Sequence, residues 1–186
     1  MRVIAGTARG VRLGAVPPGA RPVSDRAREG LFSSLGDRVE GAIVLDLFAG
    51  TGALGIEALS RGAEHAVFVD RSGRATAAVR DNLERARLAE RSTVRRTDAL
   101  GFLARAHHPE GPFDLVFLDP PYDLVDPELG RICAALASGW LAEGWTVVLT
   151  RANRSSTPVI PVDWAVSRRL RYGDSLLTLF QEVRWA

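Results

Sequence analysis

The sequence predicts an α/β protein built on a doubly wound, mostly parallel sheet of seven strands. Two observations lead to this prediction. Between residues 43 and 151, short β-like runs alternate with helical patterns, which indicates parallel strands joined by crossover helices. After residue 151 the alternation stops, and two β-like runs joined by Gly173-Asp174 indicate a terminal β-hairpin. Five parallel strands and this hairpin together give the seven strands.

The expected parallel strands are short and largely apolar. They cover residues 43–48, 66–70, 92–97, 113–119 and 145–150. The run 113–119 is nearly continuously apolar, which is typical of a central parallel strand that is covered on both faces. The expected hairpin strands cover residues 164–172 and 176–183.

Helical periodicity fills the intervals between these strands. We expect helices near residues 53–61, 74–88, 98–106 and 127–137. The helix expected at 74–88 carries one apolar face, formed by Ala75, Ala78, Val79, Leu83 and Ala86. In the helix expected at 127–137, Cys133 shares helical spacing with apolar residues. This spacing favours a structural role in the core over a role as a nucleophile.

The N-terminal segment differs in style from the rest of the chain. Residues 2–13, broken by Gly6 and Gly10, predict a small β-hairpin, and Pro17-Pro18-Gly19 predicts a linker. Ser24 is expected to cap a helix that turns Ala27, Leu31, Phe32 and Leu35 inward. We therefore expect a basic N-terminal extension over residues 1–20 and a main domain over residues 21–186.

Composition limits the class of protein. Of 186 residues, 46% are apolar and 25% are charged, which is usual for a globular domain and excludes a mainly disordered chain. No apolar run approaches the roughly 18 residues of a membrane helix. The single cysteine excludes an intrachain disulfide and an all-cysteine metal cluster. We expect a cytoplasmic, metal-free protein, and a monomer because nothing in the sequence demands a dimer.

Charge is unevenly distributed along the chain. Residues 1–38 hold seven Arg against three acids (+4), residues 39–150 eleven against sixteen (−5), and residues 151–186 six against three (+3). All 24 basic residues are Arg. GC-rich codon usage would explain the Arg bias, and so would phosphate binding by guanidinium groups at both ends of the chain. Composition alone leaves both explanations open.

A glycine-rich turn follows the first predicted strand. Gly50, Gly52 and Gly55 have the spacing of dinucleotide-binding turns, and Asp70 ends the second strand, where it can accept hydrogen bonds from ribose hydroxyls. This pattern predicts a nucleotide-like ligand and leaves NAD and S-adenosylmethionine open. Asp46 favours S-adenosylmethionine, because a carboxylate would repel the pyrophosphate of NAD and suit a ligand with sulfonium and ammonium groups.

A second motif, Asp119-Pro120-Pro121-Tyr122, follows the fourth predicted strand. Ligands of open parallel sheets bind beyond the carboxyl ends of the strands, so this motif should face the same site as the glycine turn. The prolines fix the backbone and remove two N–H donors. The Asp119 carboxylate and the Pro120 carbonyl can then accept from one amino group, while Tyr122 stacks on a planar ring.

These two motifs together resemble the class I, Rossmann-like S-adenosylmethionine-dependent amino-methyltransferases. More narrowly, the chain resembles the bacterial 16S rRNA (guanine-966-N2)-methyltransferase family, RsmD. The resemblance runs nearly end to end and is most specific in residues 2–6, 9–13, 21–32, 46–63 and 172–174. Two departures stand out: Asp70 where Glu is commoner in the family, and Arg where relatives often carry Lys.

The resemblance implies methyl transfer from S-adenosylmethionine to the exocyclic N2 of a guanine in 16S rRNA, within an assembling 30S subunit. Three alternatives remain. A DNA adenine-N6 methyltransferase would share the Asp-Pro-Pro-Tyr motif but usually carries an additional target-recognition region. A dehydrogenase would leave Asp46 and Asp119 unexplained. A non-enzymatic RNA-binding module would need the basic ends but not Asp119.

The resemblance and the motifs together give three sets of candidate site residues. The expected catalytic residues are Asp119, Pro120 and Tyr122. The expected cofactor-binding residues are Asp46, Phe48, Ala49, Gly50, Thr51, Gly52, Asp70, Arg71, Asp98 and Ala99. The expected RNA-binding residues are Arg9, Arg12, Arg21, Arg26, Arg28, Arg168 and Arg169. Asp98 could also serve simply as a helix cap.

Overall fold

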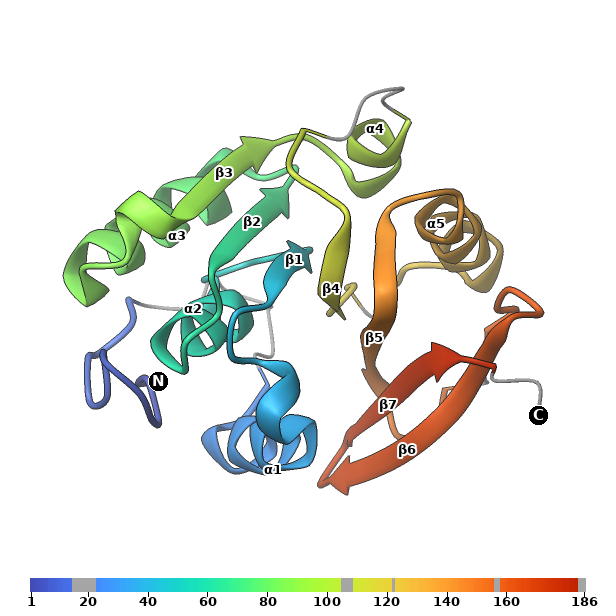
Figure 1. Cartoon of the computed structure of the whole chain (residues 1–186), viewed down its shortest axis with the longest axis horizontal. Coiled ribbons are helices and arrows are strands. Elements are labelled where there is room, and N and C mark those ends of the chain that lie inside the picture. Colours follow the sequence, from blue (N-terminus) through green and yellow to red (C-terminus); the bar gives the residue numbers. More distant parts are fainter. Residues whose placement is uncertain (15–22, 105–108, 122, 156–157, 184–186) are drawn as a thin grey trace.

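The computed structural model describes residues 1–14, 23–104, 109–121, 123–155 and 158–183. Its seven-stranded sheet has the order β3-β2-β1-β4-β5-β7-β6 (Figure 1). The strands are β1 (Ile43–Leu47), β2 (His65–Asp70), β3 (Ser92–Arg96), β4 (Phe113–Leu118), β5 (Leu141–Ala152), β6 (Trp164–Tyr172) and β7 (Ser175–Glu182). The first five pair in parallel and β7 pairs antiparallel with β5 and β6, so the predicted fold class is confirmed.

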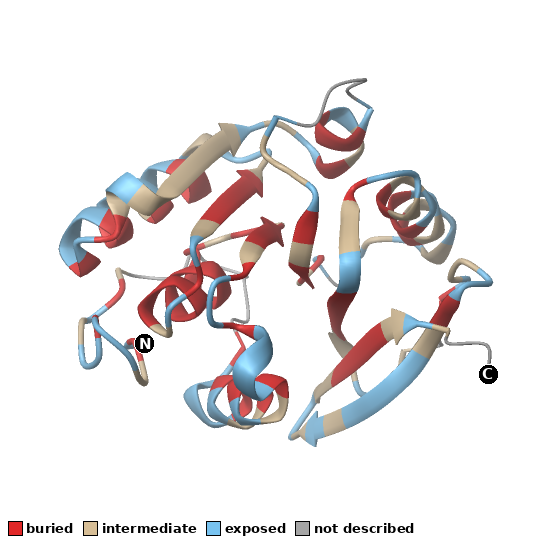
Figure 2. Cartoon of the chain, in the orientation of Figure 1, coloured by how far each residue is buried: buried red, intermediate tan, exposed pale blue. Residues whose placement is uncertain are grey.

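Helices cover both faces of this sheet (Figure 1). They are α1 (Asp25–Leu35), α2 (Ala53–Ser60), α3 (Gly73–Ala86), α4 (Ala99–Leu103) and α5 (Asp126–Ala137), with short 3-10 turns at Gly36–Arg38 and Ala89–Arg91. One core cluster joins the sheet to α1, α2 and α3, and a second joins it to α4 and α5. The central strands β1, β2 and β4 are the most completely buried (Figure 2), in agreement with their apolar sequences.

The helices begin where the sequence predicts. The Ser24 and Ser72 hydroxyls accept from the backbone N–H groups of Ala27 and Ala75, which caps α1 and α3. In α5, Cys133 is 1% exposed, and burial raises the pKa of its thiol to about 12. The prediction that Cys133 belongs to the core is confirmed.

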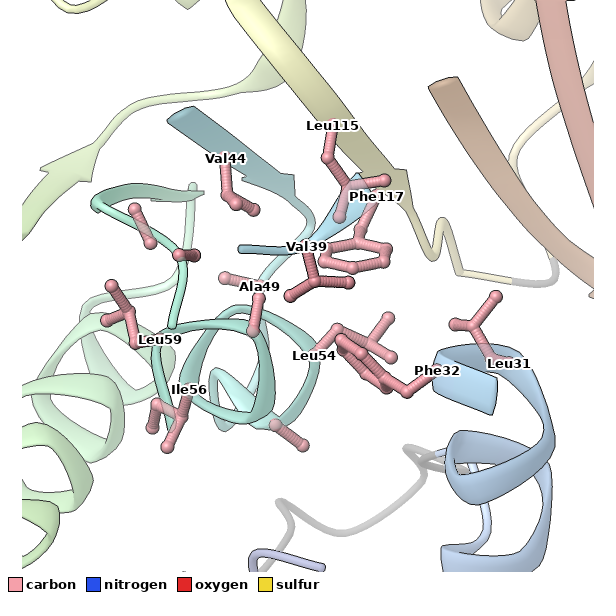
Figure 3. Close-up of a cluster of buried hydrophobic side chains, with 14 of the residues drawn as sticks. Leu31, Phe32, Val39, Val44, Ala49, Leu54, Ile56, Leu59, Leu115 and Phe117 are labelled. Atoms are coloured by element: carbon pink, nitrogen blue, oxygen red, sulfur yellow. The ribbon is translucent and has the colours of Figure 1, made fainter. Parts of the chain in front are cut away.

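Helix α1 packs onto the sheet through the apolar face that the sequence predicts. Leu31 and Phe32 point toward Phe117 of β4 and Leu54 of α2 (Figure 3). The Phe32 and Phe117 rings lie 5.8 Å apart between centroids. Arg61 lies over the Phe32 ring, 4.9 Å from its centroid, and so ties the end of α2 to α1.

The N-terminal segment forms the expected antiparallel pairing, although with a single bridge, Arg2 to Arg12. It docks on α2 through Glu57, which is completely buried. The Glu57 carboxylate accepts from the N–H groups of Ile4 (2.8 Å) and Ala5 (3.1 Å). Because a buried carboxylate needs partners, this arrangement joins the N-terminal segment firmly to the sheet domain.

Arg28 completes this buried network. Its guanidinium lies 2.7 Å from Asp25, 2.6 Å from the carbonyl oxygen of Arg2 and 3.5 Å from Glu57. The residue is fully buried. The expectation that Arg28 contacts RNA is therefore wrong, because its guanidinium is fully buried and phosphates cannot reach it.

One strand is longer than the sequence predicts. Strand β5 starts at Leu141 rather than near Trp145, and Phe113 of β4 pairs with Leu141 before the register shifts. Gly144 has φ 72°, so the strand is irregular at that residue. The Glu143-Gly144 pair resembles a turn in the sequence, and the structure accommodates it as a bulge.

Candidate active site

The loop after β1 turns sharply into α2. Gly50 and Gly52 have φ 57° and 75°, left-handed values that cost a glycine little. Phe48 also has a positive φ, 62°, which is unfavourable for a bulky residue. The structure thus maintains a strained residue at the carboxyl end of the sheet, a pattern that clusters at functional sites.

Helix α2 packs very closely behind this turn. A Cβ atom on Gly55 would collide with the Phe68 ring of β2, so glycine is required there. The Gly55 N–H donates to Asp46 Oδ2 at 2.9 Å. Asp46 is therefore held inside the turn rather than exposed to solvent.

Asp70 fixes the other side of the turn. Its Oδ2 accepts from the Gly50 N–H at 2.9 Å, and its Oδ1 accepts from the Ser72 N–H at 2.8 Å. Each carboxylate oxygen has a further lone pair that can accept from a ligand hydroxyl. Asp70 thus links the first turn to the second strand and keeps acceptor capacity beside it.

A cavity of about 220 Å³ opens at this carboxyl edge of the sheet. Five of the ten predicted cofactor residues line it: Phe48, Asp70, Arg71, Asp98 and Ala99. The other five predicted residues shape the turn beside the cavity without lining the cavity itself: Asp46, Ala49, Gly50, Thr51 and Gly52. Pro121 of the Asp-Pro-Pro-Tyr motif also lines the cavity, together with four residues that the sequence did not indicate: Asp123, Leu124, Val125 and Glu128.

Asp98 lies between β3 and α4. Its Oδ1 accepts from the Gly101 N–H at 2.8 Å, so it caps α4, and it also lines the cavity. The two roles expected for this residue are therefore compatible in one side chain.

The site is rich in carboxylates that repel one another. Burial raises the pKa of Asp46 well above its usual range, and the nearby Asp119 and Asp70 raise it further, against the Gly55 hydrogen bond, which lowers it. Such an environment disfavours a further anion and favours a cation. The carboxylate set thus suits a sulfonium and ammonium ligand better than a pyrophosphate.

Asp119 follows β4 at the switch point between β1 and β4. Its N–H lies 3.5 Å from the Leu47 carbonyl, and burial raises the pKa of its carboxyl to about 7. Strand register places Thr150 beside it, because Leu118 pairs with Leu149. The Thr150 hydroxyl is buried, and it forms no hydrogen bond of good geometry with the described residues. Its proximity nevertheless lowers the pKa of the Asp119 carboxyl and so opposes part of the rise that burial causes.

Two prolines follow Asp119 in the Asp-Pro-Pro-Tyr motif. Pro120 is buried and Pro121 is exposed at the cavity wall. Tyr122 lies outside the described residues, so its stacking role stays a prediction. The structure thus brings Asp119 to the same edge of the sheet as the glycine turn.

The candidate RNA-binding residues divide into three groups. Arg9, Arg12, Arg26, Arg168 and Arg169 are exposed. Arg168 Nη1 also donates to Ser34 Oγ at 2.9 Å, which joins β6 to α1. Arg21 lies outside the described residues, and Arg28 is buried, as shown above.

Comparison with known proteins places the chain in a family. The family model described as "Conserved hypothetical protein 95" matches residues 1–181. The chain belongs to this family. It corresponds to the RsmD family that the motifs indicated, so that recognition is confirmed.

Individual relatives of this RsmD-family chain match over nearly its full length. The "Putative rRNA methyltransferase YlbH" of Bacillus subtilis is 46% identical over 184 residues, covering 98% of this chain and 99% of the relative. The "Ribosomal RNA small subunit methyltransferase D" of Escherichia coli K12 is 34% identical, covering 97% and 89%. The solved structure of the putative methyltransferase yhhF from Escherichia coli superposes with a TM-score of 0.84 at 34% identity, covering 98% and 97%.

Across the described ranges, no helix is long and apolar enough to cross a membrane. In the same part of the chain, no three His, Cys, Asp or Glu side chains group so as to hold a metal ion.

Proposed function

We propose that the chain transfers a methyl group from S-adenosylmethionine to the exocyclic N2 of a guanine in 16S rRNA, at the position equivalent to guanine 966. One observation carries this proposal: the Asp119 loop and the Asp70 turn meet at one cavity edge of the sheet. Relatives named as small-subunit rRNA methyltransferases support the RNA substrate.

The residues around the cavity fit S-adenosylmethionine. Asp70 would hold the ribose hydroxyls, while Phe48 and Val125 offer apolar surface to the adenine. Asp46, Asp70 and Asp119 lie close enough to interact electrostatically, and these carboxylates favour the cationic end of the ligand. When bound, the cofactor supplies a methyl group already activated by the sulfonium.

The chain's own task is to position and prepare the amine. Guanine N2 is a poor nucleophile because its lone pair is delocalised into the ring. Hydrogen bonds from the two N2 protons to Asp119 and to the Pro120 carbonyl would localise that lone pair. Positioning of this kind can contribute on the order of 7–11 kcal/mol to the lowering of the barrier.

Asp119 also suits the removal of a proton. Formation of the new N–C bond leaves N2 with one proton in excess, and the Asp119 carboxylate can accept it when it is ionised. Its pKa of about 7 lies near neutral pH, where a group can both accept and release a proton. The proton then passes to water at the open side of the cavity.

The RNA has to present an unpaired guanine to this edge, since N2 of a paired guanine lies within the duplex. Exposed Arg residues on the N-terminal segment and on β6 would hold the flanking phosphates. We further propose that the protein acts in the cytoplasm as a monomer, on the assembling 30S subunit.

The test is the mapping of N2-methylguanosine. Purified chain and S-adenosylmethionine are incubated with assembling 30S particles, naked 16S rRNA or duplex DNA, and methylated nucleosides are identified by mass spectrometry. We expect N2-methylguanosine at one position, most abundant in the 30S particles. Methylation of adenine N6 in DNA would instead support the alternative function, and absence of methyl transfer from all three substrates would contradict both.

Cofactor choice is tested separately. Calorimetry should show binding of S-adenosylhomocysteine and no binding of NAD, because the carboxylate-rich turn disfavours a pyrophosphate. Binding of NAD in preference to S-adenosylhomocysteine would contradict the proposed chemistry.

A further inference from the structure

A second cavity, of about 350 Å³, lies between the N-terminal segment and the first turn of α1. It shares no lining residue with the cavity at the carboxyl edge of the sheet. Its volume is in the range of small-molecule sites. Its lining consists of Arg2, Val3, Ile4, Arg9, Gly10, Asp25, Arg26 and Glu29.

The walls of this cavity are held in place by the buried network described above. Arg28 binds the Arg2 carbonyl on one wall and the Asp25 carboxylate on the other, at 2.6 and 2.7 Å. The Ile4 N–H donates to the buried Glu57 of α2. Because both walls are anchored to the same network, the cavity exists before any ligand binds, and little ordering is required on binding.

The charges that face the cavity are unbalanced. Arg2, Arg9 and Arg26 are exposed and form no ion pair with any residue that the structure describes. Asp25 is neutralised by Arg28, which leaves Glu29 as the only uncompensated carboxylate of the lining. Three guanidinium groups against one carboxylate attract an anion, and planar guanidinium forks match phosphate oxygens.

We propose that this cavity binds one nucleotide of the RNA strand that flanks the target guanine, with the phosphodiester on Arg2, Arg9 and Arg26. Glu29 accepts a hydrogen bond from a ribose hydroxyl or a base amino group of the same nucleotide. The proposal rests on the proposed function, because it is the methylation substrate that supplies the strand. It adds a subsite, separate from the methyl-transfer cavity, that fixes the strand before the guanine enters.

The presence of Glu29 in the lining favours a nucleotide over a bare anion as the ligand of this cavity. A carboxylate beside a phosphate repels it, so a site for phosphate alone would gain from its absence. A nucleotide carries hydroxyl and amino donors within a few ångströms of its phosphate, and these donors turn the carboxylate into a favourable partner. RNA offers the 2′-hydroxyl at every residue.

The first experiment compares two double variants with equal changes in charge. Arg9→Gln/Arg26→Gln alters the cavity, and Arg74→Gln/Arg80→Gln alters exposed residues of α3 as a control. Binding of a labelled single-stranded oligoribonucleotide of about 12 nucleotides is measured across a salt titration. Loss of the contact to this one phosphodiester should reduce the salt slope by about 0.7, which is about 5-fold in affinity at 0.1 M salt. The control pair should keep the wild-type slope, and equal slopes for the two pairs would overturn the proposal.

The second experiment tests the nucleotide against a bare anion. The variant Glu29→Gln removes a charge from an exposed position, so it should fold normally. We expect it to bind inorganic polyphosphate more tightly than wild type while its affinity for the oligoribonucleotide falls or stays level. If affinity for both probes rises by the same factor, the cavity is an anion-binding patch only and the proposal is wrong.

The failure of this inference can be told apart from that of the proposed function. If wild type methylates guanine in 30S particles and the cavity pair binds RNA as tightly as the control pair, the subsite is refuted and the function stands. If wild type methylates no guanine, the proposed function fails and this proposal fails with it. Unchanged binding of S-adenosylhomocysteine by both pairs shows that the fold is intact in each case.

Discussion

The ionisation of Asp119 should appear directly in the stability of the protein. The perturbation is Asp119→Asn, which keeps the shape of the side chain and removes the titrating charge. Burial raises the pKa of this carboxyl from its usual 3.8 to about 7. The folded protein therefore holds the Asp119 proton more tightly than the unfolded chain does.

The sign of the pH effect follows from that difference. Because the folded state binds the proton at pH values where the unfolded chain has lost it, the free energy of unfolding falls as pH rises from about 4 to about 7. A change of about three pKa units at 1.36 kcal/mol each gives roughly 4 kcal/mol. The carboxyl of Asp119 is buried although the residue as a whole keeps some exposed surface, so water screens part of this cost and about 2–4 kcal/mol is the range we expect.

The assay is urea unfolding of wild type and Asp119→Asn at a series of pH values from 4.5 to 8.5. Subtracting the two curves removes the other titrating groups. The stability of the variant relative to wild type should rise with pH and level off above about pH 7.5. The same variant should lose most methyl transfer, since removal of one oriented group in a catalytic site costs about 2.7–4 kcal/mol of barrier. A difference curve that is flat with pH, or falls, would refute the argument that Asp119 carries a buried charge.

Four further predictions concern single residues. Asp70→Asn should weaken binding of S-adenosylhomocysteine by about 1–3 kcal/mol in calorimetry, and unchanged affinity would remove Asp70 from the site. Arg28→Met should lower the free energy of unfolding by about 3–5 kcal/mol in urea while the folded protein keeps its RNA affinity; the opposite result would restore Arg28 as an RNA ligand. Thr150→Val should move the acid limb of the methyl-transfer rate to higher pH, because its hydroxyl lowers the pKa of Asp119, whereas Thr150→Ser should leave that limb in place. In single-turnover assays Tyr122→Phe should retain most activity and Tyr122→Ala should lose it, and equal loss in both would show that the hydroxyl is required.

Local patterns predicted most of the fold. Strand and helix positions came from apolar runs and from helical spacing, and Ser24 and Ser72 cap the helices that follow them. The meeting of the two motifs also follows from sequence, because parallel strands place their carboxyl ends at one edge. The division near residue 20 falls outside the described residues and stays a prediction.

Features that depend on distant residues could not be predicted. Arg28 lies in an Arg-rich stretch of the sequence, which favoured a role in RNA binding. Only the fold brings it to Glu57, 29 residues away in the sequence. The cavity wall at Asp123 and Glu128 carries no motif of its own, although its position directly after Asp119-Pro120-Pro121-Tyr122 is a signal that could have indicated it. The early start of β5 depends on a bulge at Gly144 that resembles a turn in the sequence.

The docking of the N-terminal segment has a consequence for the order of folding during synthesis. Ile4 and Ala5 are synthesised before their partner Glu57, which follows more than 50 residues later. The partner of Gly14 is synthesised later still, since the Gly14 N–H donates to Asn82 Oδ1 at 2.7 Å. Contacts so far apart along the chain form slowly, because the intervening loop has to close first. The docking of the N-terminal segment is therefore completed only after α3 has emerged, so the cavity beside it also forms late.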